Sequence, residues 1–189
     1  MTDQDRRRLY EQATLERKNR ADRCHRQADA DRCILADALL RHAVGTPDYR
    51  VERTPQGKPY LPDRPDFHFS LTHSGPWVAI AWGTEPLGLD LEVFRPDARQ
   101  EKIARRFFCP DEQAYLQRHP DRFFKLWTMK ESYLKYRGTG LALALDSFCV
   151  LKPEDLGVFF MDHPLENAAM TLCAKTPKAE VRRLTIAEI

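Results

Sequence analysis

Two carboxylates alternate with leucines in the sequence G-L-D-L-E at 88–92. If this segment is a strand, its period of two places Asp90 and Glu92 on one face, with their roots about 7 Å apart. Two such carboxylates can converge on one cation, and a hard divalent ion such as magnesium takes oxygen ligands while keeping positions for water or phosphate. The pair therefore suits a metal ion that also holds a phosphate. The same pattern is typical of a polar strand face in solvent, and the pair alone does not decide between the two.

A third carboxylate lies in W-T-M-K-E-S-Y-L-K at 127–135, where helical periodicity places Lys135 one turn beyond Glu131. In isolation these two side chains form a surface ion pair worth about 0.3 to 0.5 kcal/mol. Lys130 directly precedes Glu131, and Trp127 shares the face of Glu131, where an indole ring is usually packed in the core. The segment gains a chemical interpretation only together with the two carboxylates of the strand.

Several basic side chains could meet phosphate groups. Residues 17–32 have a modest basic excess, which suits either a solvated helix face or phosphate contacts. His73, in L-T-H-S-G, can bond within its own turn or reach an anion. Ser74 is expected to form the turn, because no G-x-S-x-G elbow surrounds it. A G-x-x-x-x-G-K-[ST] loop is absent from the sequence, which excludes the P-loop class of phosphate chemistry.

The composition is that of an ordinary globular protein. Its 189 residues, 42% of them hydrophobic, can form one domain or two small packed lobes. No apolar run reaches the roughly 18 residues of a membrane span, and the first residues lack the apolar stretch of a secretory signal. The five cysteines are scattered without C-x-x-C spacing, which disfavours a disulfide framework and a zinc site. We therefore expect a cytoplasmic protein, and the net charge of +2 disfavours a general polyanion binder.

The elements that must position these groups can be predicted along the chain. Residues 3–43 contain no glycine or proline and have apolar positions at helical spacing, which predicts helix. The proline-rich segment 48–66 contains T-P-Q-G-K-P, a tight turn that displays Lys58. Alternating residues then predict a hairpin and a third strand, with strands at 67–72, 77–82 and 87–93.

The second half of the chain follows a similar pattern. Pro110 starts a short helix that His119 and Pro120 break, and Asp121 caps a longer helix that ends at Gly138. Helix followed by strands, twice, indicates two similar α+β lobes joined near residues 94–100. The strands predicted in the second lobe are 146–151, 157–161 and 168–174.

These pieces occur in the order and spacing of a known family. Over nearly its whole length the chain resembles Sfp-type 4′-phosphopantetheinyl transferases, and the two carboxylate motifs together make the resemblance specific. Enzymes of this family transfer the phosphopantetheine arm of coenzyme A to a serine of a carrier protein and release adenosine 3′,5′-bisphosphate. The matching segments are G-K-P at 57–59, F-H-F-S-L-T-H-S-G at 67–75, G-L-D-L-E at 88–92, R-R-F-F at 105–108 and W-T-M-K-E-S-Y-L-K-Y-R-G-T-G-L at 127–141.

The resemblance implies a fold and a set of site residues. The fold is α+β, with two pseudo-symmetric lobes at 1–93 and 94–189, each a helix packed on a small antiparallel sheet, and with the active site in the cleft between them. Magnesium, or manganese, which accepts the same ligands, would be bound by Asp90, Glu92 and Glu131. Coenzyme A would be held by Lys58, Thr72, His73, Lys130, Arg17, Arg20 and Arg32, with His73 near the 3′-phosphate.

The family's chemistry leaves two ways to remove the proton of the attacking serine. Glu131 removes it directly, or a magnesium-bound water that Glu131 orients removes it, since magnesium favours the charged form of a ligating carboxylate and makes it a poorer base. Lys135 would stabilise the departing phosphate. The catalytic candidates are therefore Glu131 and Lys135.

The resemblance also implies a partner and leaves an alternative. The partner would be an acyl or peptidyl carrier protein, a small acidic helical domain, and the enzyme would be a monomer that binds neither nucleic acid nor membrane. The stretch 95–108 combines basic side chains with two phenylalanines and is either a docking surface or a helix that packs the lobe. Ser70 stands where the family usually has asparagine. The alternative function is a non-catalytic, magnesium-dependent module that binds coenzyme A or a nucleotide.

Overall fold

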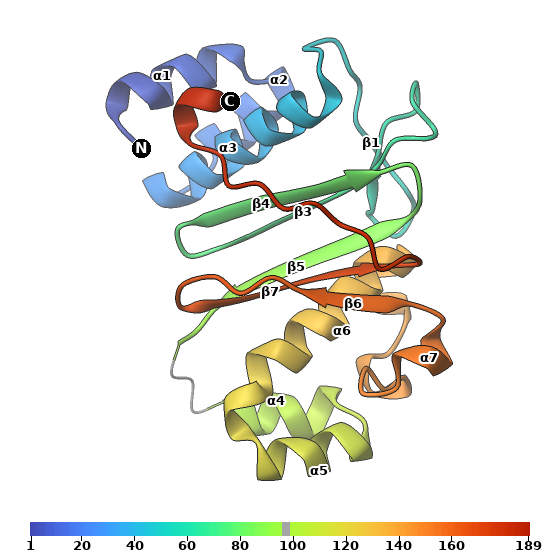
Figure 1. The fold of residues 1–189 in the computed structure, drawn as a ribbon. Helices are drawn as coiled ribbons and strands as arrows, with labels where there is room; N and C mark the ends of the chain where they lie inside the picture. The colour runs from blue at the N-terminus through green and yellow to red at the C-terminus, as the bar shows by residue number, and fades with distance from the viewer. Residues whose placement is uncertain (96–98) are drawn as a thin grey trace.

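The computed structural model describes residues 1–95 and 99–189 as a mixture of helices and small antiparallel sheets (Figure 1). The helices are α1 (Asp3–Gln12), α2 (Leu15–Asp22), α3 (Gln27–Val44), α4 (Gln100–Phe107), α5 (Pro110–Arg118), α6 (Phe123–Arg137) and α7 (Pro153–Leu156). The strands are β1 (Glu52–Arg53), β2 (Pro59–Tyr60), β3 (His68–Ser74), β4 (Trp77–Gly83), β5 (Leu87–Val93), β6 (Phe159–Asp162) and β7 (Ala168–Ala174). The predicted α+β class is confirmed.

The sheets lie between two groups of helices, α1 to α3 at one end of the molecule and α4 and α5 at the other (Figure 1). Helices α1 to α3 cover the hairpin of β3 and β4, and the sheet of order β5-β7-β6 lies next to that hairpin. Helix α6 packs against β5 and β7. Helices α4 and α5 lie beyond α6. In the described part of the chain, no helix is long and apolar enough to span a membrane.

The helical prediction for 3–43 is wrong in one respect, because the structure divides this stretch into three helices. The backbone is extended at Ala13 and Thr14, and again at Arg26. At the first break, buried Asp37 accepts hydrogen bonds from the backbone N–H and the hydroxyl of Thr14, at 3.2 and 3.1 Å. A side chain that satisfies the backbone in this way competes with helix continuation. Helical periodicity alone cannot reveal such a long-range partner.

The predicted hairpin is confirmed, with β3 and β4 paired from His68 opposite Gly83 to Ser74 opposite Trp77. The third predicted strand is also confirmed as β5, but it pairs with β7 and only lies against β3. Serine hydroxyls bridge β3 and β5. Ser70 Oγ accepts a hydrogen bond from the N–H of Leu89 at 2.9 Å, at the position where the family usually has asparagine.

In the second half, the two predicted helices and the last two strands are confirmed as α5, α6, β6 and β7. The predicted cap is wrong, because Asp121 lies within a 3₁₀ turn, Pro120–Arg122, and α6 begins after Arg122 without a side-chain cap. The strand predicted at 146–151 is wrong: this segment begins in a 3₁₀ helix, Leu145–Ser147, and continues without a strand. Its backbone groups form hydrogen bonds with side chains and not with a neighbouring strand. Lys130 donates to the carbonyls of Leu145 and Phe148, and Glu112 accepts from the N–H of Val150.

The predicted junction at 94–100 includes residues 96–98, which lie outside the described residues. The following helix, α4, has exposed basic side chains, including Arg105 and Arg106. The two phenylalanines after them turn inward: Phe108 is buried, and Phe107 packs edge-on against Trp127. Trp127 itself packs in the core cluster around α6, as the sequence predicted.

Candidate active site

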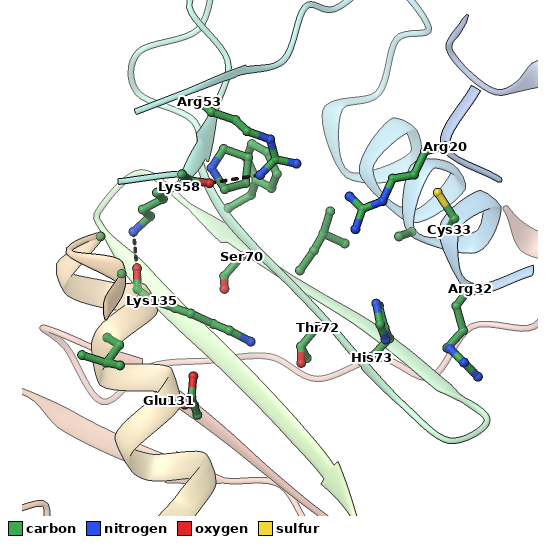
Figure 2. A pocket seen from close by; sticks show the side chains of 18 of the residues that line it. Arg20, Arg32, Cys33, Arg53, Lys58, Ser70, Thr72, His73, Glu131 and Lys135 are labelled. Carbon is green, nitrogen blue, oxygen red and sulfur yellow. Dashed lines mark hydrogen bonds between the residues drawn. The ribbon is translucent and has the colours of Figure 1, made fainter. Parts of the chain in front are cut away.

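A cavity of about 550 Å³ opens beside α2, α3, β3 and α6 (Figure 2). Figure 2 shows Glu131 and Lys135 of α6 on one side and Arg20 and Arg32 on the other, with Thr72 between them. Most of the residues expected to act on coenzyme A line this cavity: Arg17, Arg20, Arg32, Lys58, Thr72, His73, Glu131 and Lys135. The folding of the chain therefore brings together residues that lie more than 100 positions apart in the sequence.

Asp90 is the most deeply buried of the three predicted metal ligands, with 5% of its surface exposed. Its Oδ1 accepts hydrogen bonds from Lys135 Nζ at 2.6 Å and from the Thr72 hydroxyl at 3.3 Å. Its Oδ2 is buried without a hydrogen-bond partner. Burial raises the pKa of Asp90 above its usual range, and the nearby Lys135 ammonium opposes that shift. An unpaired oxygen on a buried carboxylate is costly unless a cation completes its surroundings.

Glu92 lies two residues further along β5, on the same face as Asp90. Its Oε2 accepts a hydrogen bond from the Ser74 hydroxyl at 2.9 Å, and the guanidinium of Arg95 lies 3.8 Å from the same oxygen. Because Ser74 Oγ also accepts from the N–H of Val93 at 3.1 Å, its single proton is directed to Glu92. Ser74, expected only to form a turn, thus fixes the orientation of a predicted ligand.

Glu131 reaches the cavity from α6, opposite β5. Its pKa is raised, first by burial and then by the negative charges of Asp90 and Glu92, while Lys135 lowers it. Among the described residues, Lys135 does not form the surface ion pair predicted with Glu131. Its ammonium is bonded instead to Asp90 and, at 3.0 Å, to the carbonyl of Leu89. The charges of neighbouring carboxylates thus raise the pKa of both Asp90 and Glu131, which marks a site of concentrated negative charge.

This donor set fits a hard divalent cation in three respects. All the ligands offer oxygen, one buried carboxylate oxygen has no partner, and the mutual repulsion of the carboxylates would be relieved by positive charge. In the part of the chain that the structure describes, however, these three groups do not bring ligand atoms within 4.8 Å of one another. Cys109, Glu112 and Cys149 do so, but Glu112 is already paired with Lys130. A cation held by all three carboxylates would therefore require their oxygens to move closer together.

The basic side chains form the opposite wall of the cavity. Arg32 donates to the carbonyl of Gly75 at 3.0 Å and pairs with Asp29, and Arg17 Nε lies 3.8 Å from Asp37. Partial burial, followed by the charges of Arg32 and Arg20, lowers the pKa of His73. Positive charge that depresses a histidine pKa marks a place where an anion would be favoured.

The ammonium of Lys58 is directed into the end of α6. It donates to the carbonyls of Lys135 at 2.6 Å, Tyr136 at 3.2 Å and Leu87 at 3.2 Å, so that it caps the last turn of the helix and ties it to β5. Burial lowers its pKa. Lys58 borders the cavity, yet in this structure all three ammonium protons have backbone acceptors.

Lys130 does not line the cavity, although the resemblance implies that it contacts coenzyme A. Its side chain is fully buried on the side of α6 away from the cavity, 2.7 Å from Glu112 Oε2, and it lies over the ring of Phe148. The carbonyls of Leu145 and Phe148 accept its two other protons at 2.7 and 2.9 Å. The reason is helical geometry: Lys130 and Glu131 are neighbours in sequence and so point about 100° apart.

Sequence reasoning missed Arg53, which also lines the cavity (Figure 2). It pairs with Pro59 across the turn that displays Lys58, and its guanidinium donates to the carbonyl of Gly57 at 3.0 Å. The signal was present in the sequence, because a tight turn at T-P-Q-G-K-P implies that the residue before it lies opposite the residue after it.

Comparisons with known proteins agree with the resemblance. A model described as the 4′-phosphopantetheinyl transferase superfamily matches residues 86–182. A 4′-phosphopantetheinyl transferase of Bacillus subtilis is 37% identical over 161 residues, which are 78% of this chain and 70% of that protein. The 4′-phosphopantetheinyl transferase Sfp of Bacillus subtilis strain 168 is 38% identical over 151 residues, 74% and 66% of the two chains. The 4′-phosphopantetheinyl transferase AcpT of Escherichia coli O157:H7 is 33% identical over 153 residues, 78% and 76%. The chain therefore belongs to the 4′-phosphopantetheinyl transferase superfamily.

Proposed function

We propose that this protein transfers the 4′-phosphopantetheine arm of coenzyme A to a serine of an apo carrier protein and releases adenosine 3′,5′-bisphosphate. One observation carries the proposal: a single cavity has Glu131 and Lys135 at one wall, with Lys135 bonded to Asp90 of the neighbouring strand, and a cluster of basic residues at the other wall. That arrangement suits a pyrophosphate held at a cation and a second phosphate held by arginines. Family membership supports the same reaction.

Asp90, Glu92 and Glu131 would hold the magnesium ion. Thr72 and Ser74 would keep the two strand carboxylates oriented through their hydroxyl hydrogen bonds. When bound, magnesium would shield the charge of the coenzyme A pyrophosphate, and manganese offers the same coordination. The unpartnered Oδ2 of Asp90 supports this role.

In the reaction, the hydroxyl oxygen of the carrier serine forms a bond to the β-phosphorus of coenzyme A, and the bond from that phosphorus to the bridging oxygen breaks. The electron pair leaves with adenosine 3′,5′-bisphosphate. Glu131 accepts the serine proton, either directly or through a water molecule that it orients. Burial and the neighbouring carboxylates raise its pKa, which favours proton uptake. Lys135 donates a hydrogen bond to the phosphate oxygens as negative charge moves onto the leaving group.

The other cavity residues would bind the nucleotide half of coenzyme A. Arg17, Arg20 and Arg32 would address its phosphates, and His73 would lie near the 3′-phosphate. Lys58 would act from the rim by fixing the end of α6. Lys130 would support the same helix from the core, in place of the coenzyme A contact that the resemblance implied.

The proposal extends to the architecture and the partner of the protein. The chain would form two pseudo-symmetric lobes, 1–93 and 94–189, with the reaction in the cleft between them. It would act as a monomer in the cytoplasm, on an acyl or peptidyl carrier protein whose acidic surface meets the exposed basic side chains of α4.

The alternative is a module that binds coenzyme A or a nucleotide with magnesium and transfers nothing. The relatives are transferases by name, and this chain keeps both Glu131 and Lys135 at the cavity, which favours transfer. Transfer by the unsubstituted protein would exclude this alternative, and substitution Asp90→Ala tests the metal assignment. Transfer to a carrier protein and stabilisation of the protein by magnesium should both be lost in this variant, whereas full magnesium-dependent activity would overturn the metal assignment.

A further inference from the structure

The segment after β7 returns to the opposite end of the molecule. Residues 175–189, drawn in red in Figure 1, leave the three-stranded sheet, run past the β3–β4 hairpin and end among helices α1 to α3. On the way, the guanidinium of Arg183 lies over the ring of Trp77, 5.0 Å from its centroid. The segment ends in a short 3₁₀ helix, Ile186–Glu188, which Thr185 caps. We call residues 175–189 the strap.

Two kinds of contact fasten the strap to the helices. Arg8 of α1 donates to the carbonyl of Ile189 at 2.8 Å and to the carbonyl of Ile186 at 2.7 Å. The side chains of Ile186 and Ile189 pack on the cluster formed by Leu9, Ala21, Cys33, Ile34 and Ala38. A guanidinium bonded to two carbonyls and an apolar contact beside it define one position of the strap on the helices.

The cluster that the strap covers contains residues of α1, α2 and α3 as far as Ala38, and no residue of the strands. The end of α3 is held differently, because Leu40 and Val44 pack with Phe69 of β3 and with Leu61. Buried apolar contacts therefore join the helical layer to β3 at the C-terminal end of α3. At the other end, the strap adds apolar cover that comes from the far side of the molecule.

That strap-covered end carries the basic wall of the cavity. Arg17 and Arg20 lie on α2, and Arg32 directly precedes Cys33, which is both a member of the cluster and a lining residue of the cavity. Arg32 also donates to the carbonyl of Gly75 in the β3–β4 turn, so its place depends on how α3 lies on the hairpin.

We propose that the strap, fastened through Arg8, Ile186 and Ile189, positions α2 and the first half of α3 for coenzyme A and so sets the affinity for this substrate. The inference rests on the proposed function, in which these arginines bind coenzyme A phosphates. Helices α1 to α3 and residues 183–189 lie outside the matched family region, residues 86–182. The strap acts at a distance from the carboxylates, so it changes binding and leaves the chemical step unaltered.

The expected change in coenzyme A affinity follows from the fraction of molecules whose helices are in the binding-competent position. If loosening the strap leaves the helices in the binding-competent position only about a tenth of the time, the apparent Kd for coenzyme A rises about 10-fold. Turnover at saturating coenzyme A is unchanged, because bound substrate restores the competent position. A merely structural role would instead reduce the fraction of active molecules, which lowers kcat and leaves KM as it is.

The test compares Arg8→Met with Arg7→Met, which removes the same charge from the adjacent, exposed position of α1. Ile186→Ala is a second, uncharged variant, with Val181→Ala as its control at a position 54% exposed. Calorimetric Kd for coenzyme A, KM and kcat for transfer, and hydrogen exchange of α2 and α3 are measured on the full chain.

We expect Arg8→Met and Ile186→Ala to raise the Kd and KM for coenzyme A about 10-fold, with faster exchange in α2 and in the first half of α3 and an unchanged kcat. The two controls should stay within about twofold of the unsubstituted protein. An unchanged Kd in both strap variants overturns the inference, as does a fall in kcat with an unchanged KM. If the unsubstituted protein itself binds no coenzyme A, the proposed function fails first, and this inference with it.

Discussion

The ammonium of Lys135 lies 2.6 Å from Asp90 Oδ1, while the second oxygen of the same carboxylate is buried without a hydrogen-bond partner. The Lys135 ammonium thus partners Oδ1 of Asp90, and Oδ2 can accept a cation. The pair links β5 to α6 and brings the two carboxylate motifs of the sequence into one site.

Lys135 is expected to be essential for turnover. In Lys135→Ala, the departing phosphate loses a charged donor and Asp90 loses its cation, so kcat should fall about 100-fold or more. Lys125→Ala is the matched control, because Lys125 lies on the same helix and pairs with Asp162 outside the cavity. Steady-state transfer kinetics give the comparison, and near-normal turnover in Lys135→Ala would remove this lysine from the mechanism.

Lys130 is expected to act on stability and not on coenzyme A. In Lys130→Met, the fully buried Glu112 carboxylate loses its cation, and the free energy of unfolding should fall by about 3 to 5 kcal/mol. The double variant Lys130→Met with Glu112→Gln should lose less, because it leaves no unpaired buried charge and the amide oxygen can still accept from a backbone N–H.

Urea unfolding of both variants, together with the Kd for coenzyme A of the folded protein, separates the two roles of Lys130. Unchanged stability with weakened coenzyme A binding would restore the direct contact that the resemblance implied for this lysine.

Gly88 is expected to tolerate no side chain. A Cβ at this position would lie 2.0 Å from the carbonyl oxygen of Ser132 and 2.3 Å from the N–H nitrogen of Tyr136, so the backbone of α6 would have to move away from β5. Gly88→Ala should cost about 3 kcal/mol or more in unfolding free energy, and it should reduce activity by separating Asp90 from Glu131.

Gly83→Ala controls for the loss of a glycine, since its Cβ would meet only Leu87 Cδ2, at an ordinary 3.6 Å. Thermal unfolding and transfer rates compare the two variants. Equal stability of Gly88→Ala and Gly83→Ala would show that β5 and α6 are less closely packed than described.

Coenzyme A binding is expected to depend on pH through His73. In the free protein, burial and the charges of Arg32 and Arg20 keep its pKa below the usual 6.5, so the imidazole is neutral near pH 7. A bound 3′-phosphate favours the charged imidazolium and raises the pKa, so binding takes up a proton. Affinity should therefore rise as the pH falls from the bound-state pKa toward the lower free-state pKa.

Calorimetry across this pH range tests the role of His73. His73→Gln should keep only the pH dependence that comes from the phosphate itself, and dephospho-coenzyme A, which lacks the 3′-phosphate, should show none of the histidine contribution. An identical pH profile in His73→Gln would place the 3′-phosphate elsewhere.

Local patterns were sufficient to predict much of the fold. The alternation around Leu71 and around Asp90 identified β3 and β5, and the proline at 110 and the glycine at 138 marked a helix start and a helix end. Each of these signals lies within the element that it specifies. The α+β class followed from them.

Two failures share a different cause, which is a side chain that satisfies backbone groups far away in the sequence. Asp37 bonds to Thr14 at the first break in the helical stretch, and Lys130 bonds to the carbonyls of Leu145 and Phe148, next to and within the segment predicted as a strand at 146–151. The site shows the same limit. Spacing placed Asp90 and Glu92 on one face, but the partnership of Lys135 with Asp90 depends on how α6 packs on β5.

The central claim is transfer of phosphopantetheine, and intact-mass measurement of the acceptor tests it most directly. The protein is incubated with coenzyme A, magnesium and each of several apo acyl and peptidyl carrier proteins, with magnesium omitted in a parallel set. We predict that at least one carrier gains the mass of one phosphopantetheine group, only when magnesium is present, and that adenosine 3′,5′-bisphosphate appears in equal amount. No mass gain on any carrier would contradict the account.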